Sequence, residues 1–435
     1  MDNKSTETFG DLTPWGEPAW YNVLDSPYYG ESHRRLRAFV RDYVDNKVLP
    51  FQEEWEESGV VPAEDRLLFA QSGLAFQDIP AQYRRGYTLP AGIPDEEWDI
   101  FHSLILYDER SRVNSGPLSG LTSGTAIGAP PIAVYGTEEQ KNAWLPGVFS
   151  GETSFCLGAT EPTGGSDLAN LRTTAKMTPD GKFYIVNGHK KWITGALIAT
   201  HMTTAVRTGG PGTGGISVLV IDTKSHGFSA RKIKNTGNNA GGSAWVTLEN
   251  VKVPVENRVG EENKGFPILM GNFNKERFII AASMNRRARL CLSVALNYAA
   301  ERVTFGKALD THQIIRFKFA TIARNLEAHW AWVEQIAYHV KRHGWTSDIA
   351  SRMALAKVQG GHLLELACRE AQQVLGGASY QVGGVGSDVE QTSRDLRVMV
   401  VGGGSEEIIT DLAIRQEQRL MDRLRNISSD SKAKL

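Results

Sequence analysis

The strongest constraint on the fold is a change in residue composition and hydrophobic periodicity along the chain. Between residues 151 and 265, short runs rich in β-branched and aromatic residues are separated by glycine and polar turns, as in KFYIVNG, GISVLVIDT and SAWVTLENVKVP. Long runs with helical periodicity stand on both sides of this segment. Many short strands at close spacing are typical of an antiparallel barrel or sandwich. The order α, then β, then α predicts an α+β protein.

Helical periodicity and glycine clusters define the flanking parts. Leu36, Val40 and Val44 repeat at the spacing of one helix face, and this helix is expected to end before Pro50. Further long helices are expected over residues 266–303, 312–343, 346–374 and 406–424. The expected parts are an irregular extension (1–30), an α-helical domain (31–150), a β domain (151–265), a second α-helical domain (266–425) and a tail (426–435).

Composition excludes several classes of protein. The 48 Lys and Arg residues nearly balance the 49 Asp and Glu residues, so no nucleic-acid partner is expected. No run approaches the roughly 18 to 20 apolar residues of a membrane helix. The three cysteines, Cys156, Cys291 and Cys368, are far apart and odd in number, which argues against a disulfide framework and for a reducing compartment. No metal site is expected.

The two ends of the chain bear on localisation. The first 11 residues carry three acidic side chains, and no Arg precedes Arg34, unlike an Arg-rich mitochondrial transit peptide. The last three residues, Ala433-Lys434-Leu435, are similar to the S-K-L peroxisomal address. A peroxisomal protein is therefore expected, and a cytoplasmic or mitochondrial location is the alternative.

Two runs in the β segment have the chemistry to hold a flat or anionic ligand. The run TEPTGGSD, residues 160–167, is a glycine-rich turn whose hydroxyls and free amides suit an anion or the polar edge of a heterocycle. The run NGHKKWITG, residues 187–195, places a large aromatic residue, Trp192, beside the hydroxyl of Thr194. Each run also has a plain structural interpretation, as an ordinary turn and as a strand whose Trp belongs to the core.

Together with three later runs, these segments resemble the acyl-CoA dehydrogenase family. The later runs are ERVTFGK (301–307), QVLGG (373–377) and GSEEI (404–408), and all five occur in the order and approximate spacing of the family. The resemblance covers nearly all of residues 31–425. It implies an N-terminal helical domain, a middle β-barrel and a C-terminal four-helix bundle.

The resemblance also implies FAD, held between the β domain and the C-terminal helices and shared with a neighbouring subunit. A homo-oligomer is therefore expected, as a tetramer built from two dimers. An Arg suits the pyrophosphate because its rigid fork of donors matches phosphate oxygens. The matching positions are Thr160, Ser166, Trp192 and Thr194 around the flavin, Arg302, Thr304, Phe305, Gln313, Gln373 and Gly377 at the neighbour's FAD, and Ser405 as a further cofactor contact.

The family's reaction removes a proton α to a thioester and a hydride from the β carbon. Because such a C–H bond is weakly acidic, the site must stabilise the enolate and desolvate the base. Many members carry the base, a Glu, in the loop before the last helix, where this sequence has Gly403. A minority branch, including isovaleryl-type and long-chain members, carries it on the first long C-terminal helix, before an Arg. The match over residues 270–278 makes Glu276 the expected base, with Glu406 and Glu407 as alternatives.

The residues around Glu276 support this assignment in part. Glu276 precedes Arg277 and the apolar run FIIAAS, so burial is expected to raise its pKa, although a solvated Glu near a helix start is the plain alternative. By resemblance, Phe273 packs on CoA and Arg277 borders the thioester or CoA end. Three features depart from the family pattern, namely Asn274, Gly195 and the absence of an Arg in residues 238–243.

Two further features receive structural interpretations. The basic cluster Arg286, Arg287 and Arg289 is expected to form salt bridges between subunits. His312, beside Gln313, is expected to support the cofactor contact without binding a metal.

The leading functional hypothesis is an FAD-dependent acyl-CoA dehydrogenase of fatty acid β-oxidation, with electron-transfer flavoprotein as its electron acceptor. One alternative is an acyl-CoA oxidase that passes electrons to O2, and another is an inert homologue that binds FAD or CoA. A related nitroalkane-oxidising enzyme is disfavoured because its acidic base would occupy position 403. By resemblance, a base at Glu276 favours a substrate whose acyl group is long or branched.

Overall fold

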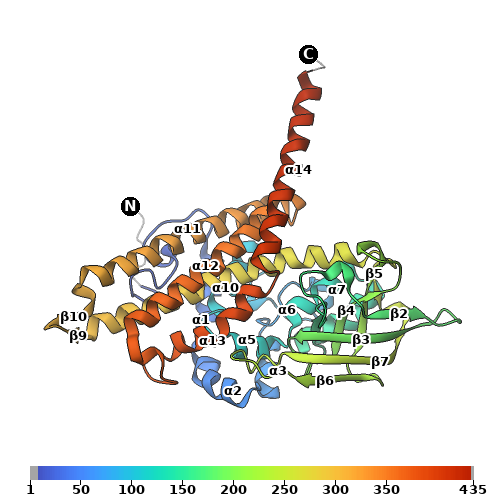
Figure 1. Cartoon of the computed structure of the whole chain (residues 1–435), viewed down its shortest axis with the longest axis horizontal. Helices are drawn as coiled ribbons and strands as arrows, with labels where there is room; N and C mark the ends of the chain where they lie inside the picture. The colour runs from blue at the N-terminus through green and yellow to red at the C-terminus, as the bar shows by residue number, and fades with distance from the viewer. Residues whose placement is uncertain (1–7, 433–435) are drawn as a thin grey trace. The chain divides into compact units, whose positions relative to one another are not determined.

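The computed structural model of the chain describes residues 8–432, with side chains through residue 426. The predicted peroxisomal address, Ala433–Leu435, lies outside the described residues. The chain forms two compact units, a sheet unit (Arg35–Trp98 and Val113–Glu276) and a helical unit (Met1–Arg34, Asp99–Arg112 and Arg277–Leu435). Two of the four boundaries between the units fall inside helices, α1 (Glu31–Lys47) and α10 (Gly265–Glu301), which Figure 1 labels.

The sheet unit is built on one eight-stranded sheet, which forms from the β-rich segment predicted by the sequence. The strand order is β6-β7-β3-β2-β4-β5-β8, and β1 pairs in parallel with β4. Most of the other pairings are antiparallel. The strands are β1 (Phe155–Gly158), β2 (Thr174–Met177), β3 (Phe183–Ile193), β4 (His201–Arg207), β5 (Ile216–Asp222), β6 (Phe228–Lys232), β7 (Ala244–Pro254) and β8 (Arg258–Val259).

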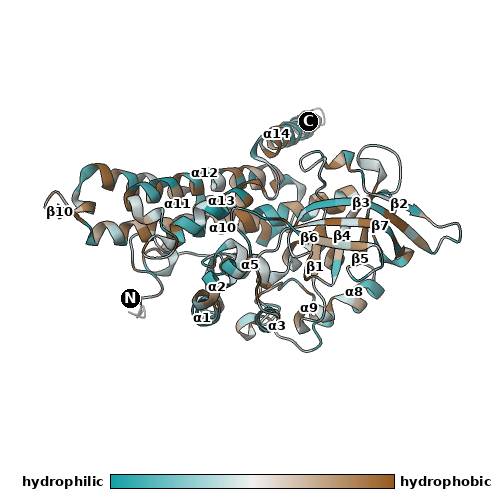
Figure 2. Ribbon diagram, turned by 60° about the horizontal axis from the view of Figure 1, so that its bottom comes forward, coloured by the Kyte–Doolittle hydropathy of each residue, from teal (hydrophilic) through white to brown (hydrophobic). Residues whose placement is uncertain are grey.

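Alternate residues of the central strands supply two separate cores. In β5, Val218 and Val220 belong to a core that also contains helical residues, whereas Leu219 and Ile221 belong to a core of strand residues such as Val246. Successive side chains of a strand point to opposite faces, so a strand with all its central residues buried has both faces covered. Figure 2 accordingly shows hydrophobic residues concentrated on the strands around β4.

Short helices complete the sheet unit. In α1 the predicted face is fully buried at Leu36, Val40 and Val44. Another helix, α8, starts at a capping box, in which the side chains of Thr137 and Gln140 each accept a hydrogen bond from the backbone amide of the other residue. Besides α1, the helices are α2 (Gln52–Ser58), α3 (Ala63–Gln71), α5 (Ser115–Thr122), α6 (Thr125–Gly128), α7 (Pro130–Tyr135), α8 (Glu138–Trp144) and α9 (Pro146–Ser150).

The helical unit contains the long C-terminal helices that the periodicity predicts. Its core joins residues of α10, α11 and α12, among them Leu292, Leu326 and Leu364. A smaller cluster of Ala354, Ile409 and Ala413 joins α12 to the start of α14, whose far end continues beyond the other helices of this unit (Figure 1). The elements are α4 (Ile100–Arg110), α10, β9 (Val303–Thr304), β10 (Lys307–Ala308), α11 (Gln313–His343), α12 (Ala350–Leu375), α13 (Ser387–Val401) and α14 (Glu406–Lys432).

One helix of this unit, α13, was not expected from the sequence. It lies between the glycine clusters at 376–377 and 402–404, and charged and hydroxyl residues interrupt its apolar pattern. Several of those polar residues, including Gln391, Thr392 and Asp395, are nevertheless buried. Within residues 8–432, no helix combines the length and hydrophobicity needed to cross a bilayer.

The basic cluster on α10 corrects one expectation, because its arginines do not face a partner subunit. Arg286, Arg287 and Arg289 are buried inside the helical unit. Each is bonded to residues of the same chain, so the fold uses them to attach α10 to its neighbours. Their side-chain acceptors are Asp108 and Glu17 for Arg286, Thr392 for Arg287, and Glu327 and Asn285 for Arg289.

The N-terminal segment takes part in the same packing. Tyr21 donates to Glu109 over 2.6 Å, and Tyr29 donates to Glu334 over 2.6 Å. The rings of Trp20 and Tyr29 stack with their centroids 3.9 Å apart. The aromatic residues that the sequence concentrates before α1 therefore anchor this segment to α4 and α11.

Candidate active site

The glycine-rich run after β1 forms a closed turn. The amides of Glu161 and Gly164 donate to each other's carbonyls over 3.1 and 3.2 Å. Thr160 stands half-buried before this turn, and Ser166 is exposed after it. The turn thus places two predicted cofactor contacts at its two ends.

The second predicted run lies at an irregularity in β3. The pairing with β7 shifts register between Lys190 and Ile193, which is a β-bulge. At the bulge, Trp192 has φ +64° and its side chain is 52% exposed. The structure therefore rejects the core interpretation of this Trp. The adjacent Lys191 amide donates to the carbonyl of Thr160 over 3.0 Å, so the two predicted runs lie side by side.

A buried ion pair connects these two runs, and the sequence patterns did not identify its role. Lys190 Nζ lies 2.9 Å from Glu161 Oε1, and both side chains are buried. Burial lowers the pKa of Lys190 to about 8. Burial also opposes ionisation of Glu161, but Lys190 and neighbouring hydrogen bonds outweigh it, so the pKa of Glu161 is lowered. The signal in the sequence was one carboxylate and one ammonium group within the two runs, at Glu161 in residues 160–167 and at Lys190 in residues 187–195.

The departure at Gly195 has a steric cause. Gly195 has φ +79°, and a Cβ atom there would lie 2.2 Å from the carbonyl oxygen of Ser123. Its amide donates to Gly241 over 3.2 Å, within the loop that lacks the family's Arg. In turn, Glu56 accepts hydrogen bonds from the amides of Asn239 and Ala240 in that loop. Only glycine fits this close approach of backbone segments.

These features of the sheet unit fit a flat heterocycle with a polar edge. The exposed ring of Trp192 offers an aromatic surface, and Thr160, Thr194 and Ser166, in the same two runs, offer hydroxyl groups. Ring stacking and hydrogen bonding to polar ring atoms are the two interactions that such a ligand requires.

Helix α10 carries the predicted base within the sheet unit. Glu276 is partly exposed as a residue, yet its Oε2 atom is buried. The preceding residue, Lys275, pairs with Asp78, and Asn272 donates to the carbonyl of Ile127 over 2.9 Å. Phe273 packs at the edge of the nearby core. This segment of α10 is therefore fixed by contacts of three residues that precede Glu276 along the helix.

The next residue of α10, Arg277, is buried in the helical unit and contacts the glycine turn before α14. Its Nε donates to the carbonyl of Gly403 over 2.9 Å. The buried Lys357 of α12 donates to the carbonyls of Val400 and Gly404. Two cationic side chains, Arg277 and Lys357, thus hold the turn that carries the base in many family members. The sequence patterns did not indicate this role for Lys357.

The alternative bases lie at the start of α14. Glu406 is paired with His362, whose Nε2 lies 3.0 Å from its Oε2, and both side chains are substantially exposed. Glu407 is exposed. The buried Oε2 distinguishes Glu276 from the exposed Glu407.

The predicted contacts to a neighbour's cofactor begin at a tight hairpin in the helical unit. Phe305 and Gly306 join β9 to β10 with φ +51° and +78°, the pattern of a type I′ turn. Phe305 is 96% exposed. His312 Nε2 lies 3.5 Å from Thr304 Oγ1. Arg302 and Gln313, at the two ends of this segment, are exposed.

The other predicted contacts of this unit lie at helix ends. Gln373 is exposed in the last turn of α12, and Gly377 follows in a short 3-10 helix, η10 (Gly376–Ser379). Ser405 stands immediately before α14. Gly377 has open space where a side chain would project. These residues all belong to the helical unit.

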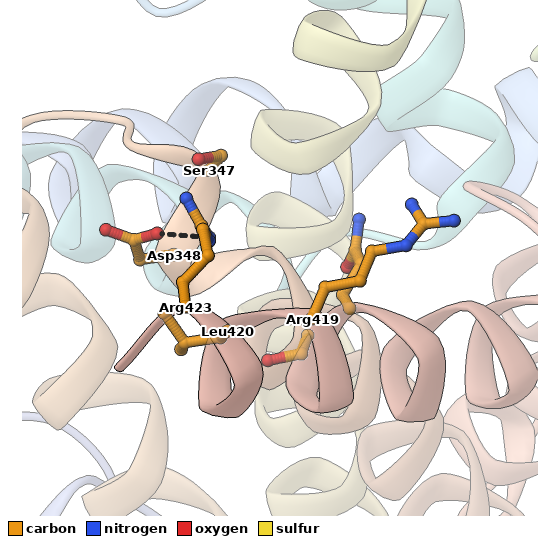
Figure 3. A pocket seen from close by; sticks show the side chains of 7 residues that line it. Ser347, Asp348, Arg419, Leu420 and Arg423 are labelled. Atoms are coloured by element: carbon orange, nitrogen blue, oxygen red, sulfur yellow. Dashed lines mark hydrogen bonds and ion pairs between the residues drawn. The ribbon is translucent and has the colours of Figure 1, made fainter. Parts of the chain in front are cut away.

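A pocket elsewhere in the helical unit contains none of the predicted residues. It lies between the start of α12 and α14 (Figure 3). Arg423 donates to Asp348 over 3.3 Å at its edge. The remaining lining residues are Ser347, Ser351, Gln416, Arg419 and Leu420.

Comparison with known proteins identifies the family. Three family models match in succession: the acyl-CoA dehydrogenase N-terminal domain over residues 30–152, its middle domain over 156–251 and its C-terminal domain over 263–417. The chain therefore belongs to the acyl-CoA dehydrogenase family. It is an FAD-dependent oxidoreductase that acts on CH–CH groups, and its fold is the helical, sheet and helical fold of that family.

Individual relatives extend over nearly the whole chain. The chain is 44% identical over 428 residues to acyl-CoA dehydrogenase AFT10-1 of Alternaria alternata, covering 96% of this chain and 99% of the relative. It is 39% identical over 418 residues to acyl-CoA dehydrogenase apdG of Emericella nidulans, covering 94% and 95%. A solved structure of a probable acyl-CoA dehydrogenase from Mycobacterium abscessus is similar with a TM-score of 0.81 and 31% identity, covering 90% of this chain and 99% of that chain.

Proposed function

We propose that this protein converts an acyl-CoA thioester to the trans-2-enoyl-CoA, with Glu276 abstracting the α-proton. The observation that carries the proposal is the buried Oε2 of Glu276 on α10, combined with a glycine at position 403. A carboxylate shielded from water is a stronger base than a solvated one. FAD, when bound, supplies the acceptor for the β-hydride.

The proposed cofactor site uses both groups of predicted residues. Trp192 and the hydroxyls beside it hold the flavin, and Arg302 with its neighbours contacts the FAD of a second subunit. The exposed and strained Phe305 supports this assignment, because backbone strain of this kind is common at ligand contacts. A homo-oligomer follows from the proposed sharing of the cofactor, and the proposal that it is a tetramer rests on the resemblance to the family.

Phe273 and Arg277 are proposed to border the CoA part of the substrate. The bond from Arg277 Nε to the carbonyl of Gly403 holds the guanidinium group beside the glycine turn before α14. The preferred acyl chain is proposed to be long or branched, and a titration of the holoenzyme with acyl-CoA esters of graded length and branching tests this.

The proposed electron acceptor is electron-transfer flavoprotein. Support comes from relatives such as the caffeyl-CoA reductase-Etf complex subunit CarC of Acetobacterium woodii. Measuring peroxide formed per turnover in air distinguishes this acceptor from O2. Peroxide in a one-to-one ratio with product would identify an oxidase instead.

The peroxisomal location stays a prediction from Ala433–Leu435. A fluorescent fusion with and without these three residues tests it, because a receptor-read address is lost with them.

The decisive test of the proposed reaction is Glu276→Gln. We expect this variant to retain FAD, because Gln has nearly the same shape, but to lose bleaching of the flavin by acyl-CoA under anaerobic conditions. A loss of at least about 10³-fold in the bleaching rate is expected for removal of a general base. Glu407→Gln, at an exposed alternative, serves as the matched control and should bleach normally.

If Glu276→Gln bleaches at the wild-type rate, the base assignment is wrong. If the wild-type flavin is not bleached by any ester of a broad acyl-CoA panel, the protein is an inert FAD-binding homologue.

A further inference from the structure

We infer that Glu161 and Lys190 are positioning residues of the cofactor site, whose buried ion pair fixes the turn after β1 against the bulge in β3. This inference rests on the proposed placement of FAD beside Thr160 and Trp192. The two residues do not touch the cofactor in this proposal. They act through the backbone of the residues next to them.

The contacts of Glu161 tie together three segments that are distant in the sequence. Its Oε1 accepts the Lys190 ammonium over 2.9 Å and the amide of Thr173 over 2.9 Å. Its Oε2 accepts the amide of Arg172 over 2.6 Å. Lys190 Nζ also lies 3.4 Å from the carbonyl of Ala159, just before the turn. One carboxylate therefore fixes the turn, the start of β2 and the end of β3.

The predicted cofactor contacts stand directly beside the pair. Thr160 precedes Glu161, and Trp192 follows Lys190 by two residues. Between them, the Lys191 amide donates to the Thr160 carbonyl. A change in the pair would therefore shift Thr160 and Trp192 relative to each other, which alters the surface that a flavin must fit.

Stability alone does not account for a buried pair at this place. Burying two charges costs free energy, and apolar replacement of a buried ion pair is often neutral or stabilising. The lowered pKa of Lys190, caused by burial, records this cost. What an apolar pair would not provide is the set of directed hydrogen bonds to Arg172, Thr173 and Ala159. The pair is therefore better explained by the geometry it imposes on the turn.

The experiment measures release of FAD from diluted holoenzyme, followed by flavin fluorescence, in Lys190→Met and Glu161→Gln. We expect each variant to release FAD about tenfold faster or more, because removing one partner of a buried pair disturbs the other. We also expect a shifted flavin absorption spectrum in both variants.

The matched control is Arg207→Met. Arg207 lies at the end of β4, in the same sheet, and donates to the carbonyls of Ala169 and Leu171, which follow the turn. We expect a comparable fall in Tm but wild-type FAD release and spectrum. A wild-type release rate in Lys190→Met overturns the inference. Equal acceleration in Arg207→Met also overturns it, because the effect would then be general destabilisation.

The double variant Glu161→Gln/Lys190→Met keeps the test open if a single variant does not fold, since it leaves no unpaired charge. We expect it to fold and still to release FAD faster than the wild type, and wild-type release would overturn the inference. The FAD release experiment needs no acyl-CoA, so its outcome does not depend on whether acyl-CoA bleaches the wild-type flavin. Flavin bleaching tests the proposed reaction, and FAD release tests the role of the ion pair.

Discussion

Three exposed aromatic residues, Trp15, Trp192 and Phe305, have backbone conformations that are costly for their residue type. All three have positive φ angles. Strain of this kind costs of order 1–3 kcal/mol per residue and persists where the surroundings impose it, often at ligand sites. The resemblance to the family selected two of these three residues, Trp192 and Phe305, from sequence motifs, whereas Trp15 lies outside those motifs.

The close packing at Gly195 gives a prediction at the residue scale. We expect Gly195→Ala to lower the free energy of unfolding by about 2–5 kcal/mol, because left-handed strain adds to the clash with Ser123. Denaturant unfolding measures the change. Gly181→Ala is the control, since Gly181 has φ +70° but open space around a Cβ, and it should cost only about 1–2 kcal/mol. Equal costs in the two variants would contradict the steric explanation.

At the scale of elements, the start of α4 is organised by one carboxylate. Asp99 is the N-cap of α4 and accepts the amides of Phe101 and His102. The ring nitrogens of His33 and His102 each lie 3.1 Å from its Oδ1, and Lys341 Nζ lies 2.7 Å from its Oδ2. Burial opposes ionisation, but the hydrogen bonds from these three side chains outweigh it, so the pKa of Asp99 is lowered well below its usual range.

This lowered pKa predicts acid sensitivity of the helical unit. A carboxyl whose pKa is lower in the folded state contributes stability above its unfolded pKa of about 4, and this contribution is lost as the pH falls further. We expect Asp99→Asn to reduce stability at pH 7 and to flatten the dependence of unfolding free energy on pH below 4. Asn is itself a good N-cap, so the loss reports the charge and not the cap. An unchanged pH profile would contradict the assignment.

The helices and strands could be predicted from the sequence where apolar residues repeat with a regular period. They could not be predicted where the buried face of an element contains polar residues. The long helices α10, α11, α12 and α14 and the β-rich segment were confirmed because apolar residues repeat along them. The shorter α13 was missed because its buried face contains Gln391 and Asp395. For the same reason, Arg286, Arg287 and Arg289 were expected to form salt bridges between subunits, although the fold buries all three and pairs Arg286 with the buried carboxylates of Glu17 and Asp108.

For the candidate site, the sequence motifs could identify segments but not the contacts that shape them. The motifs pointed to the turn after β1 and to Trp192, and the structure brings these two together. Lys357 could not be selected, because only the fold shows that it reaches the carbonyls of the turn before α14. A pairing between distant residues leaves no periodic signal in a single sequence.

At the scale of the whole molecule, exposed apolar residues around the β9–β10 hairpin argue for assembly. Val303, Phe305, Ile314 and Phe317 are all more than 60% exposed within 15 residues of chain. Apolar side chains concentrated in this way are typical of an interface. They include a residue that is predicted to contact the FAD of a second subunit.

We therefore expect Phe305→Asp to weaken the oligomer and to reduce FAD content together. Light scattering after gel filtration should show a shift toward the monomer mass of 47.8 kDa. Met177→Asp, at an exposed apolar residue of β2, is the control and should leave both properties unchanged. If the Phe305 variant loses FAD at an unchanged mass, the residue contacts the cofactor without contributing to assembly.

The carboxylate of Glu161 also has a consequence for the order of folding. Its partners lie 11, 12 and 29 residues later in the chain. During synthesis, the turn after β1 emerges first but cannot take its final shape until β3 has been made and paired. Competence to retain the flavin should therefore arise late, when the strands close around this single side chain, and a nascent chain ending before Lys190 would lack it.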